Sequence, residues 1–211
     1  VLSNTNFGNT TYVGCENGLY VKIGNNKWKR ELPSDINYSW ALKEVAALTV
    51  DTKNRLWFGA KQGIGRLEKD KWTLFTGKEG VPYTNFNCAA SGPKGQVWFG
   101  TEYGAFRVEE NIIFYRANRR WLPDNHVNSI AVDAKGTAWI ATKNGLAQIV
   151  SQKMTYPEKA AYFTQQVEER HNRMGFICQS HLTEQFDINT SQLAISDNDG
   201  QYTAMYGAAQ A

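Results

Sequence analysis

Short apolar runs alternate with polar turns through the first 150 residues, and one phrase recurs within them. In this phrase a tryptophan stands between apolar residues and is followed by a small residue and a turn that ends in glycine. The phrase occupies 56–64, 97–105 and 138–146, and its tryptophans are spaced 41 residues apart at Trp57, Trp98 and Trp139. A fixed period of this length predicts a stack of copies of one supersecondary unit, with these tryptophans in its core.

Each copy predicts four short strands separated by turns. A weaker copy at 11–19 has Tyr12 in the tryptophan place, and aromatic-rich runs after the phrase predict an outer strand. One glycine recurs in the second turn, which indicates a backbone with positive φ there: Gly18, Gly63, Gly104 and Gly145. Small residues inside the second strand predict close contact between sheets: Gly14, Gly59, Gly100 and Ala141. Four antiparallel strands in about 40–45 residues are typical of a β-propeller blade.

The predicted fold class is therefore all-β, a partial β-propeller of about four four-stranded blades over residues 1–150. The blades are expected at about 1–38 (in part), 45–84, 86–125 and 127–150, and the last of them lacks an obvious outer strand. Propellers close with about 4–8 blades. We therefore expect an incomplete ring and a chain that is a piece of a longer protein, whose remaining blades or another chain would cover the open sheets.

The period ends after Val150, and residues 151–211 predict a small, mostly helical segment that we expect to be truncated. A helix is expected over 155–174, because Thr155 and Glu158 have the spacing of a capping box and Gly175 would end it. Residues 176–196 read as irregular structure or short strands. A turn at 197–200 then leads into a second helix over 201–211.

Composition narrows the function classes only slightly. The chain has 211 residues, 42% hydrophobic and 20% charged, with a formal net charge of +3. Its Lys and Arg residues are scattered, so we expect no nucleic-acid partner, and no apolar run approaches the ~20 residues of a membrane span. Cys15 and Cys88 lie in predicted strands and are expected as buried thiols, whereas Cys178 could pair outside the chain.

The phrase Trp-Phe-Gly-Thr-x-x-Gly, with its preceding Asp-x-x-Gly turn, resembles the two-component regulator propeller repeat over about residues 8–150. That family includes sensor ectodomains of bacterial hybrid signalling proteins and some carbohydrate-active proteins. The resemblance implies an extracellular or secreted protein, periplasmic or on the cell surface if bacterial. It defines a function poorly, because propellers carry many unrelated activities.

The segment after the propeller also resembles a stretch in some large secreted bacterial proteins of that family. The resemblance lies in the runs 169–173 (Glu-Arg-His-Asn-Arg) and 197–206, which includes Asp-Asn-Asp-Gly. In those proteins the matching elements open an α/α-toroid-like domain, an architecture common among polysaccharide lyases and glycoside hydrolases. The resemblance implies only the opening of such a domain here.

Candidate binding residues lie where blade turns and blade connections are expected to share one face. This set comprises Lys61, Glu102, Tyr103, Lys143, Asn144 and His126. Tyr103 offers a ring for stacking on a sugar, while ordinary hairpin tips explain the same residues equally simply. The sequence contains no serine-hydrolase elbow, HExxH motif, phosphate loop or dinucleotide fingerprint, although paired catalytic carboxylates need no local motif.

Two further kinds of site are predicted by short motifs. Asp197 and Asp199 could hold Ca²⁺, which prefers clustered oxygen ligands, although a helix cap or a carbohydrate-contacting turn also accounts for them. No other cofactor is expected. Asn9, Asn37 and Asn189 begin Asn-x-Ser/Thr triplets and are candidate glycosylation sites of a secreted protein.

Three functions remain open from the sequence. The first is a non-catalytic propeller module of a secreted or surface protein that binds a glycan or a protein through its hairpin-tip face. The second is a fragment of a carbohydrate-active enzyme of the polysaccharide lyase or glycoside hydrolase type. The third is a structural subunit of an extracellular assembly. Whether the protein is an enzyme is not decided by these residues.

Overall fold

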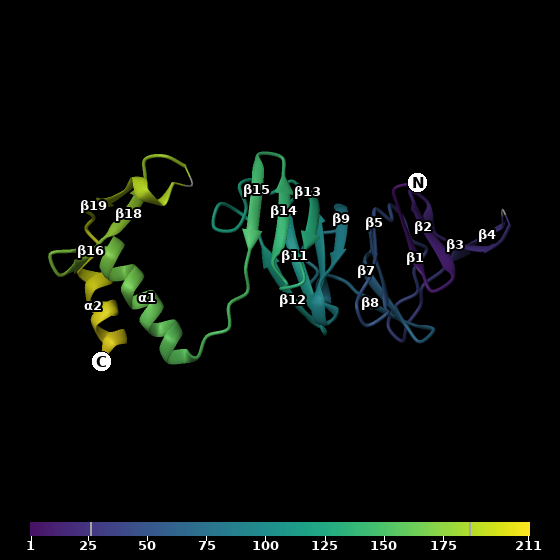
Figure 1. Ribbon diagram of the computed structural model, residues 1–211, viewed down its shortest axis with the longest axis horizontal. Helices are drawn as coiled ribbons and strands as arrows, with labels where there is room; N and C mark the ends of the chain where they lie inside the picture. The colour runs from purple at the N-terminus through teal and green to yellow at the C-terminus, as the bar shows by residue number, and fades with distance from the viewer. Residues whose placement is uncertain (26, 186) are drawn as a thin grey trace. The chain divides into compact units, whose positions relative to one another are not determined.

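The computed structural model describes residues 1–25, 27–185 and 187–211, and it divides into two compact units, Val1–Ser151 and Gln152–Ala211. Residue 26, inside the predicted first blade, and residue 186, inside the predicted segment 176–196, lie outside the described part. The first unit consists of antiparallel sheets that follow one another along the chain (Figure 1). This architecture confirms the predicted partial propeller.

The first two blades are complete four-stranded sheets in which neighbouring strands pair in sequence order. The first blade contains β1 (Ser3–Phe7), β2 (Thr10–Cys15), β3 (Gly18–Gly24) and β4 (Lys27–Glu31). The second contains β5 (Ala47–Val50), β6 (Leu56–Ala60), β7 (Gly63–Glu68) and β8 (Lys71–Phe75). The first blade was predicted only in part, because the alternation of β1 is polar and gives a weak strand pattern.

The third blade is also four-stranded, with β9 (Phe86–Ser91), β10 (Val97–Thr101), β11 (Gly104–Glu109) and β12 (Ile112–Arg116). The fourth contains only β13 (Val127–Val132), β14 (Ala138–Thr142) and β15 (Gly145–Ile149) among the described residues. Its missing outer strand agrees with the sequence, where the aromatic-rich run that follows the phrase in the second and third copies is absent.

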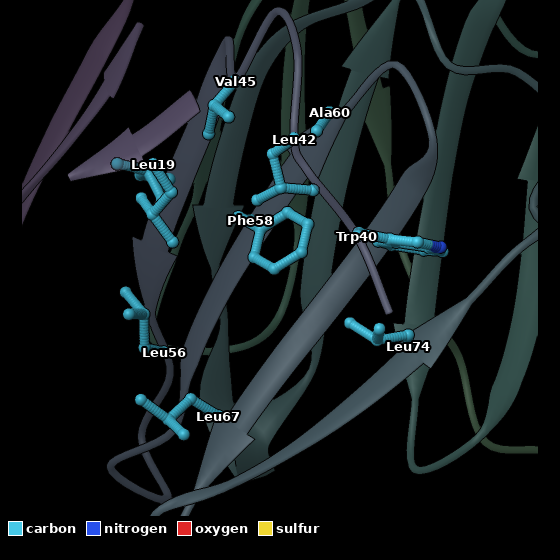
Figure 2. Packing of buried hydrophobic residues seen from close by; sticks show 10 residues of the cluster. Leu19, Trp40, Leu42, Val45, Leu56, Phe58, Ala60, Leu67 and Leu74 are labelled. Atoms are coloured by element: carbon cyan, nitrogen blue, oxygen red, sulfur yellow. The ribbon is translucent and has the colours of Figure 1, made fainter. Parts of the chain in front are cut away.

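Apolar side chains fill the space between successive sheets. Figure 2 shows the first of these cores, in which Leu19 of the first blade lies near Phe58 of the second and Leu42 of the connection between them. Two further cores lie between the second and third blades and between the third and fourth. Trp57 and Trp98 are 0% and 2% exposed, as predicted for core residues. Trp139 is 39% exposed, so its predicted burial is wrong; among the described residues no following blade covers it.

The small residues of the second strands permit this close packing. A Cβ atom on Gly59 would lie 2.7 Å from the Phe86 ring of the next blade. At the equivalent Gly100 it would lie 2.5 Å from Val127 and 2.6 Å from the Cys88 sulfur. These distances are shorter than real Cβ contacts, so the predicted role of glycine in sheet approach is confirmed at both positions.

A buried polar network ties the first turn of the second blade to its tryptophan. The Asp51 carboxylate accepts hydrogen bonds from Arg55 Nε at 2.6 Å and from Trp57 Nε1 at 2.7 Å. Arg55 also donates to the carbonyl of Gly95, in the next blade, at 2.9 Å. Asp51 and Arg55 are 5% and 3% exposed, and the pairing offsets the desolvation of both charges.

The second unit begins with α1 (Tyr156–Arg170), capped by Thr155 and Glu158 in the predicted capping box. The helix ends at Arg170, four residues before the predicted end, because Asn172–Arg173 (β16) and Phe176–Ile177 (β17) form a hairpin. Its turn residues Met174 and Gly175 both have positive φ, as two-residue hairpin turns require.

A second small hairpin and a helix complete this unit. The strands β18 (Gln179–Leu182) and β19 (Ser191–Ala194) pair in antiparallel fashion, and α2 runs over Asp199–Gln210. Cys178 is 2% exposed, and its thiol donates to the Asp199 carboxylate at 3.2 Å. Within the described residues Cys15, Cys88 and Cys178 form no disulfide.

Candidate ligand-binding site

Three turns and three blade connections meet on one face of the propeller. In the second, third and fourth blades the first turn residue donates its backbone N–H to the connection that enters the same blade. These bonds run from Lys61 to Lys43 at 2.9 Å, from Glu102 to Asn85 at 3.1 Å and from Lys143 to His126 at 2.9 Å. We call the surface made by these turns and connections the tip face.

The tip face contains all six residues that the sequence singled out. Five of them, Lys61, Glu102, Tyr103, Lys143 and Asn144, are exposed, and His126 is half-buried. Several already have local partners, since Lys61 pairs with Glu44 at 3.5 Å and Asn144 donates to Asp124 at 2.7 Å. The structure therefore brings the predicted residues onto one surface, and their role in binding remains a prediction.

Three tyrosines form an exposed cluster on this face. The rings of Tyr83 and Tyr103 have centroids 4.9 Å apart, and those of Tyr83 and Tyr115 are 5.8 Å apart. The Tyr115 hydroxyl donates to the Tyr103 carbonyl, and burial, followed by the neighbouring Tyr83, raises the pKa of Tyr115. The three side chains remain 42%, 48% and 38% exposed. A pre-packed set of exposed rings suits contact with a ligand, because little conformational entropy is lost on binding.

The backbone of the turn does not require a tyrosine at position 103. Gln62 and Asn144 hold the equivalent place in the turns of the second and fourth blades. Both turns have the same hairpin register as the turn that carries Tyr103. Sequence reasoning missed Tyr115, because the run 112–115 predicts an outer strand whose aromatic residues pack on the sheet. No local signal shows that one of these rings reaches the tip face.

A cationic loop follows the tyrosine cluster. The Arg116 guanidinium lies 4.3 Å from the centroid of the Trp121 ring, and Arg120 lies 5.6 Å from it. Arg116 Nε is buried without a hydrogen-bond partner among the described residues. Burial, and then the charges of Arg107 and Arg120, lower the pKa of Arg116. A cavity of about 340 Å³ adjoins this loop, and its lining includes Asn118, Arg119 and Asp124.

The predicted calcium residues diverge in the structure. Asp197 is exposed, whereas Asp199 is 6% exposed and accepts hydrogen bonds from Cys178 and Ser196. Arg173 also lies 3.5 Å from the Asp199 carboxylate. In the part of the chain that the structure describes, no three His, Cys, Asp or Glu side chains lie close enough together to hold a metal ion. A cation site at this turn remains a prediction.

The predicted glycosylation sites are sterically open. Asn9 lies in the turn between β1 and β2, Asn37 lies in the connection after β4, and Asn189 precedes β19. All three asparagines are exposed, although Asn189 also donates to Asp187 at 3.1 Å. Their modification remains a prediction.

No helix over the described residues has the length and apolar character needed to cross a membrane.

The successive twisted sheets, their three inter-sheet cores and the repeated tip turns define a segment of a β-propeller. Residues 122–144 match the family described as two component regulator propeller, so the chain carries this repeat. The likeness to a toroid-like domain after the propeller remains an expectation. The search of curated proteins gives no significant match.

Solved structures share the fold at low identity. The extracellular domain of a protein assigned to the hybrid two-component systems of B. thetaiotaomicron aligns at 20% identity with a TM-score of 0.55, covering 69% of this chain and 20% of that one. A second such domain from that organism aligns at 17% identity and 0.53, covering 93% and 32%. An inactive variant of virginiamycin B lyase from Staphylococcus aureus aligns at 18% identity and 0.52, covering 68% and 49%. The chain spans a fifth to a half of these proteins.

Proposed function

We propose that residues 1–151 form part of a ligand-binding propeller of an extracellular protein, and that the tip face binds a glycan. The resemblance to extracellular domains of two-component systems supports the extracellular location and a ligand-binding role. The tip face supports the position of the site, because in this part of the chain exposed aromatic rings, exposed polar turn residues and a cavity occur together.

The observation that carries the proposal is the exposed cluster of Tyr83, Tyr103 and Tyr115. Phenol rings present a flat apolar face to the C–H side of a sugar ring, while their hydroxyl groups can bond to its hydroxyls. Aromatic side chains that are already in mutual contact keep this geometry before the ligand arrives. Lys143 and Asn144, in the next turn along the tip face, could then donate to sugar oxygens.

The charge of the neighbouring loop indicates which glycans would bind. Arg116, Arg119 and Arg120 lie within five residues, and the first of them keeps a buried Nε without a partner in the described structure. A carboxylate or sulfate on a sugar would offset the mutual repulsion of these arginines and accept their hydrogen bonds. We therefore propose an acidic oligosaccharide as the preferred ligand.

The test is to titrate the whole chain with neutral and with acidic oligosaccharides and to measure the binding affinity by isothermal titration calorimetry. In the variant Tyr103→Gln the turn receives the residue that the second blade has at this place. We expect it to weaken binding at least about tenfold, which corresponds to about 1.4 kcal/mol. Tyr156→Gln is the matched control, because Tyr156 is 91% exposed and lies in the other unit.

Each outcome bears on one part of the proposal. Binding that is equally strong in the wild type and in Tyr103→Gln would place the site elsewhere. Neutral sugars that bind as well as acidic ones would remove the role given to the arginines. An absence of binding to every oligosaccharide would overturn the glycan proposal. Analysis of the sugars after incubation separates simple binding from cleavage, and thus a binding module from an enzyme fragment.

A further inference from the structure

The tyrosine cluster of the tip face brings phenol rings into contact with one another. The sequence contains ten tyrosines. In the described part of the chain, one tyrosine ring packs on another only where Tyr83 meets Tyr103 and Tyr115. The other tyrosines with aromatic partners pack on phenylalanine or tryptophan rings. Two phenols in contact permit a reaction that a phenol beside another kind of ring does not.

Tyr83 and Tyr103 have the geometry for a bond between their rings. The two centroids are 4.9 Å apart, and the ring planes differ by 34°. Aromatic pairs pack with centroids about 4.5–7 Å apart, so these rings lie near the closest separation that packing allows. Carbon atoms of the two rings are therefore in van der Waals contact, and the exposure of both side chains leaves them room to rotate.

The backbone holds these two rings together. Tyr103 lies in the turn between β10 and β11, where its backbone N–H donates to Thr101 Oγ1 at 3.1 Å. Tyr83 lies in the connection that enters the same blade. That connection is bonded to the turn, because the Glu102 N–H donates to the Asn85 carbonyl at 3.1 Å. The ring contact therefore belongs to the folded structure and is not a chance approach of two flexible side chains.

Tyr115 is a less suitable partner for Tyr83. Its ring centroid lies 5.8 Å from that of Tyr83, with 51° between the planes. Its hydroxyl donates to the Tyr103 carbonyl, which holds the proton that oxidation of the phenol must remove. Burial also raises the pKa of Tyr115, so its easily oxidised phenolate form is rarer. The geometry therefore favours the pair of Tyr83 and Tyr103.

We propose that Tyr83 and Tyr103 form a site of oxidative cross-linking, at which a one-electron oxidant such as a haem peroxidase with hydrogen peroxide joins the two rings as dityrosine. Each phenol loses one electron to the oxidant and its hydroxyl proton to water. The two radicals form one carbon–carbon bond between ring positions ortho to the oxygens. The two ortho hydrogens then move as protons, through water, to the phenolic oxygens.

The reaction is balanced by the oxidant. The two electrons and two protons that the phenols lose reduce one hydrogen peroxide molecule to two water molecules. The new bond ties the turn that carries Tyr103 to the connection that enters its blade. The cross-link requires only the contact of the two rings and does not depend on the binding of a glycan.

The probe is photochemically generated tris(bipyridine)ruthenium(III), a one-electron oxidant, applied to the full chain at micromolar concentration. We expect the monomer to lose the mass of two hydrogen atoms and to gain dityrosine fluorescence, because groups in contact react at an effective concentration far above that of other chains. Trypsin separates the three tyrosines, since Tyr83, Tyr103 and Tyr115 lie in peptides 79–94, 95–107 and 108–116. We expect the main product to join 79–94 to 95–107.

Two changes separate the role of the contact from that of the residues. Tyr103→Phe keeps the ring but removes the phenol, and we expect the dityrosine fluorescence of the oxidised monomer to fall at least about tenfold. Tyr156→Phe is the matched control, because Tyr156 is 91% exposed and lies in the other unit. Unfolding in concentrated urea before oxidation removes the ring contact and keeps the sequence, and we expect a similar fall.

Several results would overturn the proposal. An oxidised monomer that has not lost two hydrogens, or cross-linked dimers as the main product, would show that the ring contact does not lead to the bond. A product that joins 79–94 to 108–116 would assign the bond to Tyr83 and Tyr115. An equal yield of dityrosine in Tyr103→Phe would place the cross-link elsewhere, and an equal yield in urea would show that the folded contact has no part in it.

Discussion

The second and third blades place the same tryptophan in the same strand but satisfy its indole N–H differently. Trp57 donates to Asp51, while Trp98 Nε1 is buried without a partner among the described residues. Gly92 stands at the place of Asp51, so the third blade lacks the carboxylate. Burying an indole ring removes a large apolar area from water, whereas one hydrogen bond contributes about 1 kcal/mol net. The ring can therefore remain where its polar partner is lost.

The same two blades differ again at the tip face. Gln62 of the second blade uses its amide locally, donating to the Ala41 carbonyl at 3.2 Å. Tyr103 of the third blade instead packs on Tyr83 and stays half exposed. The two turns have the same register, so the backbone does not determine which side chain stands there. Function in a repeat fold can thus differ from blade to blade on one unchanged scaffold.

The largest effect is expected from Asp51→Ala. The change leaves the Arg55 charge and the Trp57 indole N–H buried without their acceptor, and breaking a buried pair in this way costs about 3–5 kcal/mol. Urea unfolding followed by tryptophan fluorescence would measure the loss. Asp133→Ala is the comparison variant, because Asp133 accepts backbone N–H groups of Lys135 and Thr137 and no arginine of the described structure pairs with it. We expect a smaller loss there. Equal losses would show that the arginine pairing contributes nothing.

Replacing the close-packed glycines should have the next largest effect. Gly59→Ala pushes a methyl group against Phe86 of the following blade, and Gly100→Ala pushes one against Val127 of the following blade and Cys88 of its own sheet. Overpacking of this kind costs about 1–3 kcal/mol. Thermal unfolding would report it. The fourth blade already has Ala141 at this position, so Ala141→Gly should not stabilise the protein by a comparable amount. Tolerance of alanine at both glycines would mean that the sheets can separate freely.

The parts of the fold that follow the period were predictable from sequence. Trp57, Trp98 and the glycines at 59 and 100 repeat at one spacing, because each blade must bury the same ring against the next sheet. The polar strand β1 was missed, because its alternation is weak. The exposure of Trp139 was missed because burial depends on a neighbouring blade, which a residue's own phrase does not encode.

The candidate site was predictable only as a face. In the second, third and fourth blades the backbone brings the turn, at Lys61, Glu102 or Lys143, to the same face as the connection that enters the blade. The repeat period predicts that arrangement. Which side chains meet on the face depends on tertiary contacts between the turn, the outer strand and the incoming connection. Tyr115 joins Tyr103 through such contacts, and no spacing in the sequence indicates them.

A smaller change in stability is expected from giving the third blade a carboxylate at the place that Asp51 holds in the second blade. Gly92→Asp alone should destabilise, because a Cβ there would lie 2.8 Å from both Gln96 and Val132. Gln96→Thr, the residue that the fourth blade has at this place, removes the contact with Gln96 and leaves the one with Val132, so the new carboxylate gains room on one side to accept from Trp98 Nε1. We expect the second change to recover part of the loss, by about 1 kcal/mol for the hydrogen bond. A double-mutant cycle by urea unfolding would measure the coupling, and strict additivity would contradict it.

The smallest effect concerns Cys88, which holds the place of Ala47 in the second blade. Burial raises the pKa of the Cys88 thiol from 9.0 to about 11. Unfolding lets the thiol ionise near pH 9, so its contribution to stability is complete below that pH and is lost as the pH rises toward 11. At pH 8 the thiolate fraction should be about 100-fold lower in the folded chain than in urea, and alkylation of Cys88 mapped by mass spectrometry should slow at least as much. Cys88→Ala identifies the labelled peptide. Equal labelling rates in the native and the unfolded chain would contradict this prediction, because they would show that β9, the strand that carries Cys88, opens readily to solvent. The second blade has no thiol at this place, since Ala47 stands there.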